Sequence, residues 1–164
     1  MIFKYFIFFL IVCSSLNAES WFCKFEEIYK NGEVQNGILL IQNENLRYEY
    51  FNPELYTLIY DPEQQLYSVL NSDRKNIQSI QKNTYIFEKL IELAKKYPSV
   101  PNELNIQNTL LKIEGSFNSN FIKRLVIISK DLNVSIYFNE CTNDKLDYNL
   151  FQVAPFTEIN DIQF

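Results

Sequence analysis

The sequence predicts a mainly β protein with one or few helices, built as a curved antiparallel sheet or incomplete β-barrel under a helical lid. About ten short runs of β-type residues are separated by turn residues at hairpin spacing. One segment, residues 83–101, has instead the 3.6-residue apolar period of an amphipathic helix. Only three glycines are present, so few tight barrel corners are expected.

Six strands are expected before the helix. The runs SWFCKFEEIYK and VQNGILLIQ flank Asn31 and Gly32, a pair that strongly favours a hairpin turn. The next four runs are LRYEYF, LYTLIY, QLYSVLN and NIQSIQ. They are separated by NPE, DPEQ and SDRK, which have the composition of turns. Consecutive strands are therefore expected to pair as hairpins.

The predicted helix has one apolar stripe and recognisable ends. Asn83 or Thr84 is expected to cap its start, and Pro98 and Pro101 to end it. The apolar stripe consists of Ile86, Phe87, Leu90, Ile91, Ala94 and Tyr97. A single amphipathic helix between two antiparallel halves is expected to lay this stripe across the concave side of the sheet. Four strands are expected after it, in IQNTLLKIEG, FIKRLVIIS, VSIYFNEC and LDYNLFQV.

The first eighteen residues resemble a secretory signal peptide. Lys4 precedes an apolar run, and small and polar residues follow it up to Ala18. The alternative, a membrane anchor, is disfavoured because the apolar run is too short to span a hydrocarbon layer of about 30 Å. We therefore expect residues 1–18 to be the signal peptide and residues 19–164 to be a single β domain of an exported protein.

Charge and cysteine content limit the possible partners. Loss of Lys4 with the signal peptide leaves 14 Lys and Arg against 20 Asp and Glu, a net charge of −6. An acidic domain of this kind argues against nucleic acid and anionic membrane surfaces as partners. Cys23 and Cys141 are the two cysteines of the mature chain, and one disulfide or two buried thiols are both open. In the chain-entropy model such a long closed loop contributes about 4 kcal/mol.

The sequence favours a protein that buries apolar groups and does not offer the residue sets of common enzymes. The chain has no histidine, so Ser-His-Asp and Cys-His nucleophile pairs cannot form and a zinc site is not expected. Glu26 and Glu27 are adjacent on a strand and therefore point to opposite faces, so they cannot act together as acid and base. We expect no enzyme activity, no catalytic residues, no metal and no cofactor.

Alternation along the strands predicts an apolar face rich in tyrosine. On residues 46–51, Arg47, Glu49 and Phe51 are assigned to the opposite face, with Arg47 and Glu49 at the surface or in cross-strand pairs. The candidate cargo-binding residues are Leu46, Tyr48, Tyr50, Tyr56, Leu58, Tyr60, Val134, Ile136, Phe138, Tyr148 and Leu150, and Leu146 shares the face of the last two. Buried tyrosine hydroxyls need hydrogen-bond partners, so such a face suits a lined cavity. An ordinary core with tyrosines at its rim is the alternative.

The order of these motifs resembles the periplasmic outer-membrane lipoprotein carrier family, the LolA type. In that family a glycine-led strand, a turn, an aromatic strand closed by proline and a further strand follow one another. Here Gly37, the run NLRYEYFNP with Tyr48 and Pro53, and the runs LYTLIYD and QLYSV match that order. The resemblance continues more weakly to FQVAPF near the end and covers about two thirds of the mature chain.

The resemblance implies a lipoprotein-carrier-like domain that shields acyl chains in an apolar cavity. It implies acylated lipoproteins as cargo, an inner-membrane lipoprotein-releasing ABC transporter as donor and an outer-membrane receptor as acceptor, with a monomeric carrier in the periplasm. The family's basic residue that holds the lid corresponds to Gln42. The family's amphipathic helix before the first strand has no counterpart here, because ESWFCKFEE is β-type sequence. The predicted helix is therefore left as the lid, with Phe87, Leu90, Ile91 and Ala94 facing the cargo.

Two other readings of the same fold remain. One is an envelope module that senses lipid or binds a protein and transports nothing. The other is a small exported structural domain with a closed core. A cavity beneath the helix is expected only for a carrier.

Overall fold

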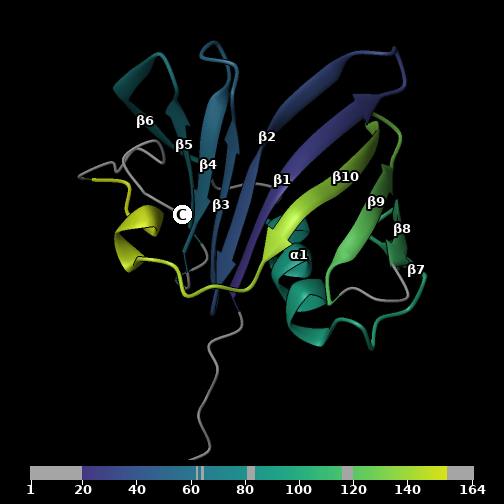
Figure 1. The fold of residues 1–164 in the computed structure, drawn as a ribbon. Helices are drawn as coiled ribbons and strands as arrows, with labels where there is room; N and C mark the ends of the chain where they lie inside the picture. The colour runs from purple at the N-terminus through teal and green to yellow at the C-terminus, as the bar shows by residue number, and fades with distance from the viewer. Residues whose placement is uncertain (1–19, 62, 64, 81–83, 116–119, 155–164) are drawn as a thin grey trace, which may run out of the picture.

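The computed structural model describes residues 20–61, 63, 65–80, 84–115 and 120–154. The predicted signal peptide lies outside these described residues. The chain forms one ten-stranded antiparallel sheet with the order β6-β5-β4-β3-β2-β1-β10-β9-β8-β7, and the sheet is not closed (Figure 1). The elements are β1 (Ser20–Tyr29), β2 (Val34–Gln42), β3 (Asn45–Tyr50), β4 (Tyr56–Tyr60), β5 (Leu66–Leu70), β6 (Asp73–Ile80), α1 (Tyr85–Lys96), β7 (Glu103–Ile106), β8 (Thr109–Gly115), β9 (Ile122–Ile128), β10 (Asn133–Thr142) and η1 (Tyr148–Phe151).

The mainly β architecture with one α-helix confirms the predicted fold class at this level. Strands β1 to β5 follow the predicted runs closely, and each strand from β1 to β6 pairs with the next in sequence. Strand β6 begins at Asp73, inside the run SDRK that was predicted as a turn, so that turn is shorter than predicted. Gly32 in the first hairpin has a φ of 83°, a conformation that glycine adopts without steric cost. After α1, the strand order places β10 beside β1, so the last strand joins the two halves of the sheet.

After α1, the structure differs from the predicted strands in two segments, and each difference has an identifiable cause. The run IQNTLLKIEG holds a turn rather than one strand, because Gln107 and Asn108 both have positive φ and separate β7 from β8. The run LDYNLFQV is not a strand but contains the 3₁₀ helix η1, and Asp147 caps it by accepting a hydrogen bond from the Asn149 amide. Gln42 binds the Leu146 amide and Arg47 binds the Leu150 carbonyl, so this segment lies across the outer face instead of extending the sheet.

Helix α1 packs on the inner face of the sheet, defined here as the face that carries Trp21, Cys23 and Phe25 of β1. Its residues Leu90, Ile91, Leu93 and Ala94 are buried there, and together with the inner-face side chains they form the main core. The helix ends before Pro98, as predicted. The predicted caps differ: Asn83 lies outside the described residues, and the Thr84 hydroxyl donates to Glu88 instead of capping the backbone.

The opposite, outer face is covered in part by η1. Leu146, Leu150 and Phe151 pack on Leu40 of β2 and form a second, smaller core. In Figure 1, η1 (yellow) and α1 (teal) lie apart, with the curved sheet between them. Gln42 lies at the end of β2 on this outer face, and its Oε1 accepts a hydrogen bond of 2.7 Å from the Leu146 amide.

A disulfide joins the central strands β1 and β10. Cys23 and Cys141 are bonded, 118 residues apart in sequence, and Cys23 is fully buried. The pairing of β1 with β10 shifts its register between Phe22 and Lys24, where Cys23 lies. The bond therefore links the strand that begins the described domain to the strand that ends its sheet.

Gly37 of β2 lies where no side chain fits. It is paired with Phe25 on one side and Tyr50 on the other. A Cβ at this position would lie 2.0 Å from the carbonyl oxygen of Glu49 and 2.4 Å from the Phe25 ring. The backbone and a buried ring would both have to move to accept it.

Gly37→Ala is therefore expected to lower the free energy of unfolding by about 2 kcal/mol or more, as overpacked cores do. Urea denaturation of the mature domain measures this change. Gly32→Asn is the matched control, because Gly32 has open space around it and asparagine tolerates its left-handed conformation. An equal loss in both variants, or none at Gly37→Ala, contradicts the packing described here.

Candidate functional site: the inner face of the sheet

The inner face brings together most of the residues predicted to bind cargo. Leu46 and Tyr48 of β3 pair directly with Tyr60 and Leu58 of β4. The side chains of Leu46, Tyr48, Tyr50, Leu58, Tyr60, Val134, Ile136 and Phe138 all belong to the main core or pack against it. Tyr56 continues the β4 alternation and is 44% exposed. The predicted parity of β3, β4 and β10 thus places these residues on one face.

The helix residues named in the prediction also lie on this face. Leu90, Ile91 and Ala94 are buried in the main core, whereas Phe87 is only half-buried. Tyr50 and Leu58 on the sheet are half-buried too. The part of the inner face that retains some exposure is therefore made by aromatic and aliphatic side chains.

Two of the predicted cargo residues are elsewhere. Tyr148 is 59% exposed on η1, and Leu150 is buried in the small core of the outer face. Leu146 joins the same outer core. Their assignment to the inner face assumed a strand, with its two-residue alternation, and the 3₁₀ helix changes which side chains share a side. The prediction that they line the same face is wrong.

The inner face contains one buried carboxylate, Glu27 of β1, which is 5% exposed. Three tyrosine hydroxyls donate to it. Tyr48 donates to Oε1 at 2.7 Å, while Tyr29 and Tyr50 donate to Oε2 at 2.6 and 3.1 Å. Every contact uses a carboxylate oxygen as acceptor, which is the pattern of an ionised group. None of the ion pairs among the described residues involves Glu27.

Gly37 explains how tyrosines of β3 reach a carboxylate of β1 across the intervening strand. Because β2 has no side chain there, the Phe25 ring approaches Gly37 closely. That ring stacks on Tyr48, with centroids 4.1 Å apart and planes at 20°, and meets Tyr50 edge-on at 5.6 Å. Tyr48 and Tyr50 also contact each other edge-on. The stacked rings fix the directions of the hydroxyls, which then converge on Glu27.

The electrostatics of this Glu27–tyrosine cluster (Glu27, Tyr29, Tyr48 and Tyr50) favour neutral phenols. Burial, followed by the hydrogen bond and charge of Glu27, raises the pKa of Tyr29 to about 12. Burial and the Glu27 charge also raise the pKa of Tyr48 and of Tyr50 well above the usual value of 10. The hydroxyls therefore remain donors throughout the physiological pH range.

The sequence prediction missed this cluster, although a signal was present. Trp21, Cys23 and Phe25 are odd-numbered apolar residues of β1, and their alternation continues through Glu27. A carboxylate in such a row needs donors on the neighbouring strands, and the tyrosines of β3 are the nearest abundant ones. The prediction that Glu26 and Glu27 cannot cooperate assumed opposite faces, and Glu27 does lie among inner-face residues.

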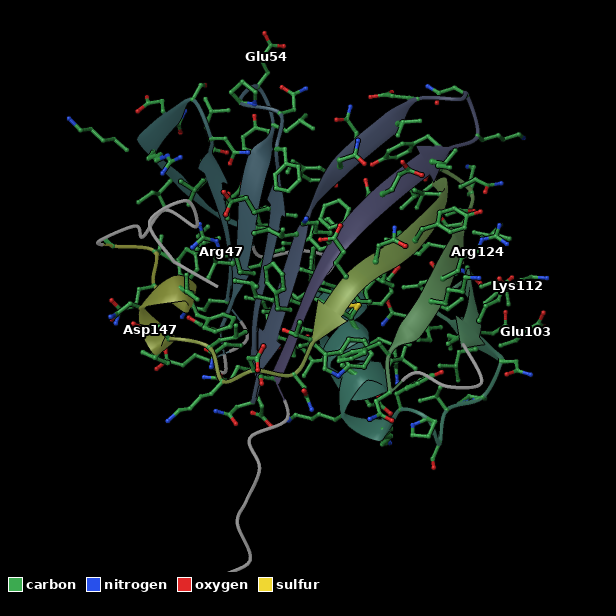
Figure 2. The ribbon with its side chains drawn as sticks, in the orientation of Figure 1. Arg47, Glu54, Glu103, Lys112, Arg124 and Asp147 are labelled. Carbon is green, nitrogen blue, oxygen red and sulfur yellow. A yellow bond between two sulfur atoms is a disulfide. The ribbon has the colours of Figure 1, made fainter. Side chains whose placement is uncertain are left out.

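Arg47 and Glu49 lie on the outer face, as their parity predicted, but Arg47 is not at the surface. It is 0% exposed and its Nη1 donates to the Leu150 carbonyl at 2.9 Å. Its Nη2 lies 2.6 Å from Glu49 Oε2, an ion pair along β3. Burial lowers the pKa of Arg47, and the charge of Glu49 opposes that effect. Figure 2 shows Arg47 beside the segment that begins at Asp147, so it anchors η1.

Gln42 has the same role. Because its side chain holds the Leu146 amide on the outer face, it does not contact α1 on the inner face. Gln42 therefore secures the C-terminal segment in this protein.

Three open grooves lie outside the space between α1 and strands β3 and β4. A shallow groove of about 300 Å³ lies at the end of the first hairpin, between Tyr29 to Asn31 and Ser129 to Asn133. Among the described residues, His, Cys, Asp and Glu side chains form no group of three or more that could hold a metal ion. In the part of the chain that the structure describes, no helix has both the length and the apolar character needed to cross a membrane.

Comparison with known proteins adds no assignment to this geometry. No protein-family model matches the chain, and no curated protein matches it either.

Replacing Glu27 with glutamine is expected to lower the pKa of Tyr29 from about 12 toward its usual value, because Glu27 supplies two of the three main causes of the increase. NMR of tyrosines labelled with ¹³C at Cζ follows this titration directly. Glu26→Gln is the control, since this neighbour points away from the cluster.

The same increase has a defined effect on stability. A phenol whose pKa is higher in the folded protein than in the unfolded chain stabilises the fold fully below pH 10. This contribution is lost as the pH rises from 10 to about 12. The wild type should thus lose stability more steeply than Glu27→Gln in that range, and identical slopes contradict the coupling.

Proposed function

We propose that the protein is a non-enzymatic carrier that holds acyl chains of a lipoprotein against the inner face of its sheet. The observation that supports this most is the partly exposed set of apolar and aromatic side chains beside α1, which includes Tyr50, Leu58 and Phe87. These are positions where a ligand gains contact without displacing a fully buried residue. An open sheet also leaves its inner face accessible from its unpaired sides.

The energetic demand on such a carrier is large. A sixteen-carbon acyl chain has about 15 methylenes, and exposing each to water costs about 0.8 kcal/mol, or about 12 kcal/mol in total. A carrier has to replace that water with apolar wall along the whole chain. In this proposal α1 is the lid. When it moves away from the sheet, Leu90, Ile91 and Ala94 become part of the wall that contacts the acyl chain.

The wider context of the proposal follows the lipoprotein carrier resemblance. Acylated lipoproteins are the cargo, an inner-membrane ABC transporter is the donor, an outer-membrane receptor is the acceptor, and the periplasm is the compartment. Because release through water is costly, the cargo is passed by direct contact between carrier and acceptor. The outer-face position of Gln42 means that this protein's α1 is held by packing rather than by a side chain at that position.

One observation favours a second candidate, an envelope module of the same fold that recognises a partner without transport. Leu90, Ile91, Leu93 and Ala94 of α1 are all buried in the main core. Displacing the helix exposes this stripe to water, which costs about 1.5–3 kcal/mol for each large side chain. If the helix never moves, only the half-exposed residues can bind, and they suit a small contact rather than a complete acyl chain.

Leu58→Arg tests the carrier proposal. Leu58 is half-buried on the inner face, and a charged side chain there excludes about two methylenes of a bound chain, so affinity for a palmitoylated peptide should fall about tenfold. Fluorescence titration with a labelled palmitoylated peptide measures the dissociation constant. Ile28→Arg is the matched control, because Ile28 is on the outer side of β1 and 37% exposed.

The outcomes separate the two candidates. Binding that weakens in Leu58→Arg and not in Ile28→Arg supports a carrier that uses the inner face. If the wild-type protein does not bind the peptide, or both variants bind it as the wild type does, the carrier proposal fails and the module becomes the better account.

A further inference from the structure

The Glu27–tyrosine cluster contains a buried charge that no cation in the described chain offsets. Glu27 is almost fully buried, and its three contacts are neutral phenol hydroxyls. Burying a carboxylate is costly unless it is paired with an opposite charge as well as hydrogen-bonded. The inner face thus carries a negative charge that accepts hydrogen bonds from tyrosines but is not paired with a cation in the described chain.

The carboxylate also retains capacity to accept a hydrogen bond. Two carboxylate oxygens offer about four acceptor positions. Oε2 accepts from Tyr29 and Tyr50, whereas Oε1 accepts only from Tyr48. One position on Oε1 therefore has no donor among the described residues, and a charged N–H donor there makes a stronger bond than a neutral one.

Three aromatic rings pack together beside Glu27, and the hydroxyls of two of them reach its carboxylate. Phe25, Tyr48 and Tyr50 pack against one another within 6 Å of centroid separation. Ring faces attract cations, and an ammonium group that leaves water for such a site gains from both the rings and the carboxylate. The combination of one carboxylate with several aromatic rings discriminates in favour of organic cations and against anions.

The site has a route of access. Glu27, Tyr48 and Phe25 are buried, but Tyr29 and Tyr50 keep part of their surface in contact with solvent. Both of these tyrosines donate to Oε2. Beyond Glu27, the neighbouring residues on β10 are apolar, Ile136 beside Glu27 and Val134 beside Tyr29.

We infer that the Glu27–tyrosine cluster binds the ammonium group of an amphiphilic ligand whose alkyl chain lies along the apolar inner face. The placement of the alkyl chain rests on the proposed function, whereas recognition of the ammonium group does not. Tyr29 and Tyr50, the two tyrosines of the cluster that keep some exposure, contact the cation, and Oε1 of Glu27 accepts its hydrogen bond. The same charge disfavours free fatty acids, whose carboxylate would lie against that of Glu27.

A calorimetric comparison of decylammonium with decanol at pH 7 tests this inference on the mature domain. The two ligands have the same chain and differ in the charge of the head group. The wild type is expected to bind decylammonium about tenfold or more tightly than decanol. In Glu27→Gln this preference should disappear, because the glutamine keeps the shape but not the charge.

Glu26→Gln is the control for general electrostatic attraction. It removes the same charge from the adjacent residue, on the other side of β1, so the preference for decylammonium should remain. Tyr50→Phe provides a second variant if Glu27→Gln does not fold. It keeps the carboxylate and the ring and frees an acceptor position on Oε2, so decylammonium should bind at least as tightly as in the wild type.

The possible results distinguish this inference from the carrier proposal. Equal binding of decanol and decylammonium overturns the ammonium site and leaves apolar binding intact. A preference for decylammonium that persists in Glu27→Gln also overturns it. Absence of binding for both ligands overturns the ammonium site and removes support for an apolar site on this face.

Discussion

The inner face is organised around one carboxylate that must be hydrogen-bonded because it is buried. Glu27 lies in a row of apolar residues on β1, and its burial demands donors from other strands. Tyr48 and Tyr50 supply them from two strands away. Their reach depends on the space above Gly37, which the Phe25 ring fills. The four features depend on one another: without the space at Gly37 or the Phe25 ring, the tyrosine hydroxyls would not reach Glu27.

One α-helix is too small to cover the inner face of a ten-stranded sheet, so part of that face stays exposed. Helix α1 buries its stripe against the inner face, while Tyr50 and Leu58 are left partly exposed. On the outer face, η1 is held by Arg47 and Gln42 through backbone groups of the C-terminal segment. The outer face is thus covered in part by η1, which side-chain hydrogen bonds hold in place, and the inner face in part by α1, which packs through its aliphatic side chains.

Much of the fold could be predicted from local sequence. Alternation identified the strands, the Asn31-Gly32 pair identified the first hairpin, and helical periodicity identified α1. These signals are local, because each depends on residues close together in the chain. The β7–β8 hairpin was missed because its turn, Gln107-Asn108, lacks glycine and proline. The segment at η1 was predicted as a strand because a short apolar alternation does not show whether a sheet edge is available.

The candidate site could be predicted only in part. Parity placed Tyr48, Tyr50 and Leu58 on one face without knowledge of the partners. The convergence of three hydroxyls on Glu27 depends on the registers of β1, β2 and β3 together, and no local pattern contains that information. The burial of Arg47 likewise depends on a contact with Leu150, 103 residues away in the sequence. Long-range contacts decide both features.

The central claim is that the half-exposed part of the inner face, between Glu27 and Leu58, is where an alkyl chain binds. The most direct measurement is an isotope-filtered NMR experiment that detects contacts between an unlabelled alkylammonium ligand and the labelled protein. The account predicts contacts from the methylenes to Leu58 and Phe87 and from the carbon next to the nitrogen to Tyr29. Contacts confined to Tyr148 or Phe22, near the small core of the outer face, would contradict it.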